Sequence, residues 1–111
     1  MLLTYKKADG TEVKVRLKTM AHSAPVTIGR DKTAHIALDD PQASRIHTAI
    51  RYWDDIFIVR DMGSSNGTLL NGRKIEVAKL TPGDVIKVGD TEIAVVPEAT
   101  PSDVTLVNRP E

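Results

Sequence analysis

Short runs of alternating apolar and polar residues, each followed by a turn signal, recur along the whole chain. In EVKVRLK, residues 12–18, Val13, Val15 and Leu17 alternate with basic residues. A period of two is typical of a β-strand with one buried face and one wet face. No segment shows a helical stripe over three turns. The turn signals that divide the runs are Asp9-Gly10, Asp54-Asp55, Gly63, Asn71-Gly72, Pro82-Gly83 and Gly89-Asp90.

The pattern predicts ten short strands. They cover residues 1–5, 12–18, 26–28, 36–38, 48–53, 56–60, 68–70, 73–75, 84–88 and 91–96. Asp9-Gly10 predicts a hairpin between the first two, because this dipeptide favours tight turns. So many short strands in about a hundred residues indicate a β-sandwich or a barrel.

Composition narrows the class of protein. The chain has 111 residues, 41% of them hydrophobic, which fits one domain with its own core. It has no cysteine, which excludes disulfides and thiolate metal sites and fits a cytoplasmic protein. Fifteen basic residues balance fifteen acidic ones, so we expect no general attraction to nucleic acid or to a membrane surface. The apolar runs are too short to span a membrane, and the N-terminus does not resemble a signal peptide.

The character of the chain changes after Pro97. The last stretch reads EATPSDVTLVNRPE and is rich in proline and polar residues. We therefore expect a domain over residues 1–97 and a tail or linker over residues 98–111.

Three predicted loops carry polar side chains suited to an anion. They are Ile28-Gly29-Arg30, ASRIH at residues 43–47, and DMGSSNGTLLNG at residues 61–72. Loops at one end of a β-sandwich commonly carry function. If these three converge, two guanidinium groups, two hydroxyls and an amide surround one volume, and none of the three central motifs adds a carboxylate. Such a set suits a dianionic phosphate better than a free carboxylate or a neutral ligand.

The order GR, SRIH, SSNGT, LNG and GDVIKVG, from about Val26 to Val96, resembles the forkhead-associated (FHA) domain. Each piece is weak alone, but the five together are specific. The resemblance implies a two-sheet β-sandwich of about ten or eleven short, mostly antiparallel strands. It also implies a non-enzymatic module without a cofactor, which binds threonine-phosphorylated partner proteins.

The resemblance assigns roles residue by residue. Arg30, Ser44 and Ser65 would bind the phosphate, Asn66 would hold the peptide backbone, and Arg45 would be a second basic contact. Gly29, His47 and Gly67 would shape the loops. Asn71 would form the hairpin turn, and a contact between Asn71 and the peptide is left open. Gln42 stands where some members place a basic residue, which leaves the preference at the third position after the phosphothreonine open.

Two other functions compete with this one. An FHA-like scaffold could bind a partner constitutively through a sheet face, without phosphate. A hydrolase would need Ser44 as nucleophile and His47 as base, with Asp39 or Asp40 orienting the histidine. We reject the hydrolase because a strand would place Ser44 and His47 on opposite faces. A metal site has little support, since His22 and His35 are isolated.

Two further expectations concern aromatic residues and the tail. Tyr52 and Trp53, at a strand end, are expected to pack rather than to stack on a ligand. Thr100-Pro101-Ser102-Asp103 places an acidic residue three after a threonine, a pattern that several FHA domains favour. Phosphorylation of Thr100 would then allow weak self-association between one chain's tail and a neighbour's domain.

Overall fold

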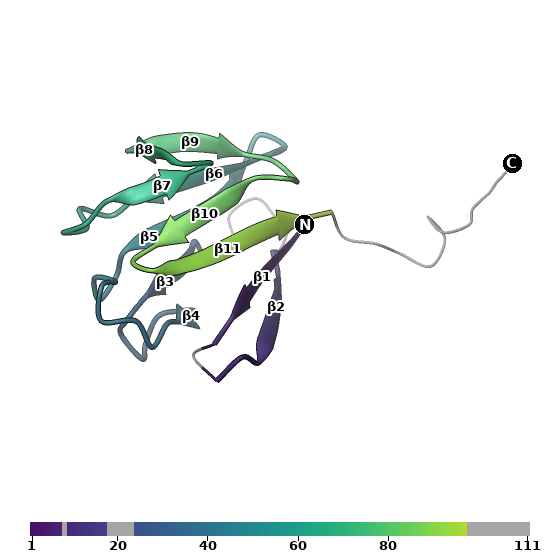
Figure 1. Ribbon diagram of the computed structural model, residues 1–111. Coiled ribbons are helices and arrows are strands. Elements are labelled where there is room, and N and C mark those ends of the chain that lie inside the picture. The colour runs from purple at the N-terminus through teal and green to yellow at the C-terminus, as the bar shows by residue number, and fades with distance from the viewer. Residues whose placement is uncertain (8, 18–23, 98–111) are drawn as a thin grey trace, which may run out of the picture.

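The computed structural model describes residues 1–7, 9–17 and 24–97, and it contains two β-sheets packed as two layers (Figure 1). The six-stranded sheet has the order β2-β1-β11-β10-β7-β8. Its strands are β1 (Leu2–Lys6), β2 (Glu12–Arg16), β7 (Thr68–Leu70), β8 (Arg73–Ile75), β10 (Val85–Val88) and β11 (Thr91–Val96). The five-stranded sheet has the order β4-β3-β5-β6-β9. Its strands are β3 (Val26–Gly29), β4 (Ile36–Ala37), β5 (Thr48–Trp53), β6 (Ile56–Asp61) and β9 (Val77–Leu80).

The predicted fold class is confirmed, with one additional strand. No helix occurs among the described residues, and every pairing is antiparallel except that of β3 with β4. Strand β9 was not predicted. Only Leu80 of β9 is buried, and the single residue Glu76 separates it from β8, so neither alternation nor a turn signal marks it.

Aliphatic side chains fill the space between the sheets. The fully buried ones come from both layers and include Leu3, Ile28, Ile50, Val59, Ile86 and Ile93. Tyr52 packs at the margin of this core, its ring centroid 4.9 Å from that of Phe57. Trp53 differs from the packing role expected of it, because the strand alternation turns it outward and leaves it 53% exposed.

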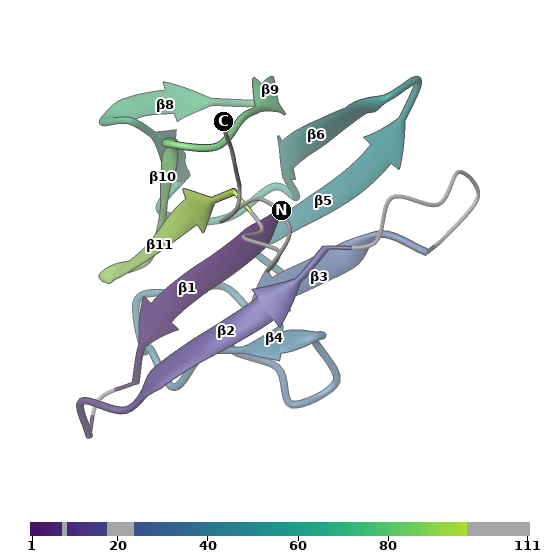
Figure 2. The same ribbon diagram turned by 90° about the vertical axis from the view of Figure 1, so that its right-hand side faces the viewer.

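The two ends of the sandwich differ in what they carry. Leu2 pairs with Val96, which places the start of β1 beside the end of β11. The segments at residues 30–35, 39–47, 61–67 and 89–90 lie at the opposite end, on the left in Figure 1. Figure 2 views the sandwich from the other end, where the start of β1 lies beside the end of β11, so the loop end faces away from the viewer. The polar loops of the sequence are thus brought to one end by the strands.

Two predicted turns have the backbone that their residues favour. Asp54 and Asp55 join β5 to β6 with φ of 53° and 65°. Asn71 and Gly72 join β7 to β8 with φ of 53° and 84°. Positive φ at both central residues matches the twist of the flanking strands. The predicted tail at residues 98–111, His22 and the end of the second predicted strand lie outside the described residues.

Candidate functional site

A glycine allows the first two loops to lock together. A Cβ atom on Gly29 would lie 2.0 Å from the carbonyl oxygen of Arg45 and 2.9 Å from that of Ser44. The next two residues use this close approach: the Arg30 N–H donates to the Ser44 carbonyl, and the Asp31 N–H to the Arg45 carbonyl, both at 3.0 Å. Any side chain at position 29 would push this backbone apart.

One hydrogen bond fixes the Arg30 side chain and leaves the end of its guanidinium group for a ligand. Its Nε–H donates to the Ala43 carbonyl at 3.0 Å, a bond that does not use the Nη groups at the tip. An open hollow of about 480 Å³ lies here. It is lined by Arg30, Asp31, Ser44, Arg45, Ile46 and Ser65. Four of the five residues in the predicted binding set therefore line one space.

The third loop joins this hollow through Ser44. The Ser44 hydroxyl accepts the Ser65 N–H at 3.0 Å, so its own proton can be donated to a ligand. Asn66, the fifth residue of the set, is exposed and donates its Nδ2–H to the Gln42 carbonyl at 2.7 Å. The Oδ1 atom is the acceptor end of this amide. Asn66 thus bridges the loops that contain Gln42 and Ser65.

His47 joins the loop of Ser44 to the loop of Gly67 through its ring nitrogens. The side chain is fully buried, and its Nδ1 accepts the Ser44 N–H at 3.0 Å. Because an amide N–H can only donate, the ring proton must lie on Nε2, which donates to the Gly67 carbonyl at 2.8 Å. The strand expected across Ser44 and His47 was wrong, since β5 begins only at Thr48. Both ring nitrogens of His47 are nevertheless hydrogen-bonded to backbone groups. The Ser44 hydroxyl bonds to the Ser65 N–H and not to this ring.

Asp61 orders the loop at residues 61–67, and the sequence analysis did not identify it. One carboxylate oxygen accepts the hydroxyls of Ser64 and Thr68, and the other accepts the backbone N–H groups of Gly63 and Ser64. Burial tends to raise the pKa of Asp61, but these hydrogen bonds outweigh it and hold the pKa below its ordinary value. The Ser64 hydroxyl in turn accepts the Gly67 N–H at 2.8 Å.

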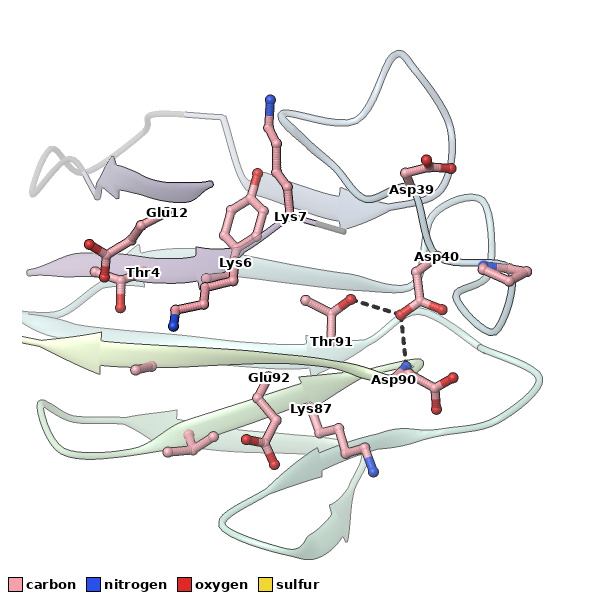
Figure 3. Close-up of a pocket in the computed structure, with 14 residues that line it drawn as sticks. Thr4, Lys6, Lys7, Glu12, Asp39, Asp40, Lys87, Asp90, Thr91 and Glu92 are labelled. Carbon is pink, nitrogen blue, oxygen red and sulfur yellow. Dashed lines mark hydrogen bonds between the residues drawn. The ribbon is translucent and has the colours of Figure 1, made fainter. Parts of the chain in front are cut away.

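Asp40 does the same for the loop before Ser44. Its Oδ1 accepts the Gln42 N–H at 2.9 Å, and its Oδ2 accepts the Asp90 N–H and the Thr91 hydroxyl at 2.7 and 2.8 Å. Figure 3 shows the two bonds that tie Asp40 to the β10–β11 turn. Burial opposes the charge of Asp40, yet these donors keep its pKa below the ordinary value. The sequence carried a signal for both aspartates. An aspartate in a loop commonly accepts the backbone N–H two residues later, as Asp40 does from Gln42 and Asp61 from Gly63.

The charge count of the hollow differs from the one expected. Asp31, directly after the Gly-Arg motif, also lines it. Its carboxylate accepts the Thr33 N–H and hydroxyl, both at 2.9 Å. These bonds, followed by the charges of Arg45 and Arg30, hold the pKa of Asp31 below its ordinary value. The hollow therefore carries two cations and one anion.

Asn71 lies away from this cluster. It follows the last residue of β7, whereas Gly67 precedes the first. Its Nδ2–H donates to Asp84 and its Oδ1 accepts the Val85 N–H, both at 2.9 Å. Both ends of the amide are thus used within the sandwich.

Another hollow, of about 700 Å³, lies beside β1, β10 and β11 (Figure 3). Three lysines and five carboxylates line it, among them Lys6, Lys87, Asp39 and Glu92. The described residues contain no group of three histidine, aspartate or glutamate side chains that could hold a metal ion. Nor do they contain a helix long and apolar enough to cross a membrane.

A sequence profile of the FHA domain matches residues 26–89, which include every residue that lines the hollow around Arg30, and also Asp40 and Asp61. The chain belongs to the FHA domain family. FHA domains are non-catalytic interaction modules.

Similar proteins fall in the same family. FhaA of Mycobacterium tuberculosis, an FHA domain-containing protein, is 38% identical over 68 residues, which cover 61% of this chain and 13% of FhaA. The glycogen accumulation regulator GarA of the same species is 38% identical over 66 residues, which cover 60% of this chain and 41% of GarA. The chain thus corresponds to less than half the length of these relatives.

Solved FHA structures superpose over most of the chain. The FhaA FHA domain complexed with the intracellular domain of Rv3910 has a TM-score of 0.71 and 32% identity, covering 83% of this chain and 97% of that one. An FHA domain from a study of phosphothreonine-dependent FHA interactions has a TM-score of 0.70 and 29% identity, covering 90% and 100%.

Proposed function

We propose that this FHA domain binds threonine-phosphorylated protein segments and recruits the partner that carries them in kinase signalling. The observation that carries the proposal is the convergence of Arg30, Ser44, Arg45 and Ser65 on one hollow. Guanidinium and hydroxyl groups are the donors that phosphate oxygens favour in proteins. The related FHA domains studied in phosphothreonine-dependent interactions support the same ligand.

Each side chain has a role in this proposal. The Nη groups of Arg30 donate to the phosphate, and the Ser44 and Ser65 hydroxyls donate beside them. Arg45 supplies the second positive charge. Asn66 accepts a backbone N–H of the bound peptide through Oδ1 while Gln42 holds its Nδ2. Asn71 has no role in the peptide site, because its amide braces Asp84 and Val85.

The proposal extends to the remaining expectations. The domain comprises residues 1–97, with residues 98–111 as a tail or linker. The protein itself is not an enzyme, and the lack of cysteine fits action in the reducing cytoplasm. A phosphorylated Thr100 would give only weak self-association, because Gln42 supplies no positive charge for Asp103.

The test is a titration of the full chain with a phosphothreonine peptide pool and with its unphosphorylated counterpart. We expect binding of the phosphorylated pool only. Arg30→Ala should weaken it about tenfold to a hundredfold, as the loss of a charge-assisted phosphate contact. Arg73→Ala removes one positive charge from β8 and is the matched control. A peptide of residues 98–111 phosphorylated at Thr100 tests self-association in the same assay.

Equal binding of both pools would favour the alternative, a scaffold that binds its partner without phosphate. Unchanged binding by Arg30→Ala would reject the site itself.

A further inference from the structure

The outward face of the five-stranded sheet is unusually apolar for an exposed surface. Trp53, Met62 and Val77 are 53%, 46% and 52% exposed, and they are the exposed large hydrophobic side chains of the described residues. Trp53 and Met62 line one hollow of about 440 Å³, with Pro25, Ala49, Arg51, Ile58 and Arg60. Arg60 pairs with Val77 on β9, which places Val77 on the same face.

The charges on this face have one sign. The outward positions of β5, β6 and β9 carry Arg51, Arg60 and Lys79, and none carries an aspartate or glutamate. The acidic neighbours of these positions lie at the strand ends. Asp54 and Asp55 follow Trp53 in the turn, and Glu76 precedes Val77. Asp61 follows Arg60, and its carboxylate is held within the loop at residues 61–67. The chain as a whole has zero net charge, so this local excess of positive charge favours an acidic partner at this face. We call this surface, formed by the seven residues of the hollow with Val77 and Lys79, the outer basic face.

A second copy of the chain does not complement the outer basic face. The outward positions of the other sheet include Lys6, Lys14, Arg16 and Lys87, against Glu12 and Glu92. Pairing the outer basic face with itself or with that sheet would bring like charges together, which opposes association. The complementary surface is apolar and acidic.

The size of the face suits a helix. From Ala49 to Trp53 the strand rises roughly 13 Å, the length of about nine residues of α-helix. Helices are the usual cover for the apolar face of a sheet. Tryptophan and arginine are also the residues that most often dominate the energy of a protein interface.

We propose that the outer basic face is a second docking surface, which binds an acidic amphipathic helix of a partner protein. The surface is separate from the hollow around Arg30 and does not depend on a phosphate. A partner could therefore engage both surfaces, and the second would add specificity to the first.

The probe is a synthetic peptide of about 16 residues, long enough to cover the face, with leucines at helical spacing and glutamates elsewhere. A scrambled peptide of the same composition, without the apolar stripe, is its control. Trp53 is the single tryptophan of the chain, so its emission reports directly on this face. We expect a saturable blue shift with the amphipathic peptide, weakening as salt rises, and none with the scrambled one.

Matched variants of the full chain assign the binding. Arg60→Glu and Arg51→Glu should each weaken it by at least about tenfold, since they place a like charge against the peptide. Lys14→Glu reverses a charge on the other sheet and should leave it unchanged. Arg30→Ala should also leave it unchanged, which separates this proposal from the phosphate site. Calorimetry with Trp53→Ala gives a reading without fluorescence, and circular dichroism checks that each variant folds.

Several outcomes would overturn the proposal. The scrambled peptide could bind equally well, or no saturable shift could occur at millimolar peptide. Sedimentation could reveal a dimer of the protein alone that Arg60→Glu abolishes, which would assign the face to a second copy. Tighter binding to phosphatidylserine vesicles than to the peptide would assign it to a membrane.

Discussion

Asn66-Gly67 and Asn71-Gly72 lie at the two ends of the three-residue strand β7. Both glycines have positive φ, 82° and 84°, so both pairs turn the chain sharply. Their asparagines differ. The Asn71 amide is used at both ends within the sandwich, by Asp84 and by the Val85 N–H. Asn66 is exposed, and it spans from one loop to the Gln42 carbonyl of another.

The residues ahead of each pair account for this difference. Before Asn66, Asp61 and Ser64 use their side chains to hold a loop that is wider than a hairpin turn. Before Asn71 there is only the strand itself, so the chain reverses in two residues. The same dipeptide therefore belongs to the proposed recognition site where a side-chain network opens the loop, and it closes a hairpin where the strands meet.

The largest expected effect comes from removing the carboxylate of Asp61, which holds the loop before Asn66. Thr68 is fully buried and donates its hydroxyl proton to Asp61, so the Thr48 hydroxyl must donate to Thr68. Asp61→Ala leaves this buried donor without its acceptor and releases the loop. We expect a loss of about 2–4 kcal/mol in the free energy of unfolding, measured in urea, and loss of phosphopeptide binding.

Asp84→Ala is the matched change at the other turn. The Asp84 carboxylate accepts from Asn71 and Thr81 near the surface, so its loss should cost about 1 kcal/mol and leave binding unchanged. Equal losses of stability in the two variants would contradict the distinction between the loops.

Exchanging the asparagines one at a time should separate binding from stability. Asn66→Ala should weaken phosphopeptide binding about tenfold and change stability by less than about 0.5 kcal/mol, because the side chain is exposed. Asn71→Ala should cost about 1–2 kcal/mol, because it breaks two hydrogen bonds and strains a residue at φ 53°. Calorimetric titration and urea unfolding of both variants measure this. A binding defect in Asn71→Ala would restore Asn71 to the peptide site.

The glycines of the two pairs differ in the same way. A Cβ on Gly72 would meet nothing within 4 Å, and one on Gly67 would meet only the flexible end of Lys74, at 2.7 Å. Alanine at either position should thus cost a similar amount, about 1–2 kcal/mol, from the strain of positive φ. Only Gly67→Ala should also weaken phosphopeptide binding, because it turns Asn66 and the carbonyl that His47 holds. Thermal unfolding and peptide titration of the two variants measure these effects. Normal phosphopeptide binding by Gly67→Ala would contradict the expectation.

The fold was largely predictable from local signals. Alternation and turn dipeptides located every described strand except β9, of which only Leu80 is buried and which follows β8 without a turn. The convergence of the loops could be expected only through the family resemblance, because it depends on how distant strands pair. Gly29 illustrates this, since its need for a small residue comes from the Arg45 backbone, sixteen positions away (45 − 29).

The supporting network was harder to predict. Asp40 acts partly through a group that becomes its neighbour only in the fold, the Asp90 N–H, whereas the partners of Asp61 lie within seven residues of it. Trp53 was expected to pack at its strand end before Asp54-Asp55, but the register of β5 places it outward. Alternation in the sequence shows which residues share a face of a strand. It does not show how far the outward face is buried by other parts of the chain.

The smallest expected effect is a difference in pH dependence between the two asparagine variants. The hydrogen bond from Asn71 is the main cause that holds the pKa of Asp84 below its ordinary value. A carboxyl group with a lowered pKa in the folded state stabilises the protein above its unfolded pKa, about 3.9, and this contribution is lost as the pH falls. Asn71→Ala removes the main cause, so the variant has less to lose in acid.

The gap in stability between the wild-type protein and Asn71→Ala should therefore narrow by roughly a few tenths of a kcal/mol between about pH 6 and pH 3, because solvent screens this group near the surface. Asn66 donates to a backbone carbonyl rather than to a carboxylate, so the small gap for Asn66→Ala should stay constant. Urea unfolding of the three proteins at both pH values measures the change. A gap for Asn71→Ala that does not move would mean that Asn71 stabilises the hairpin by its own conformation, and that its bond to Asp84 contributes little.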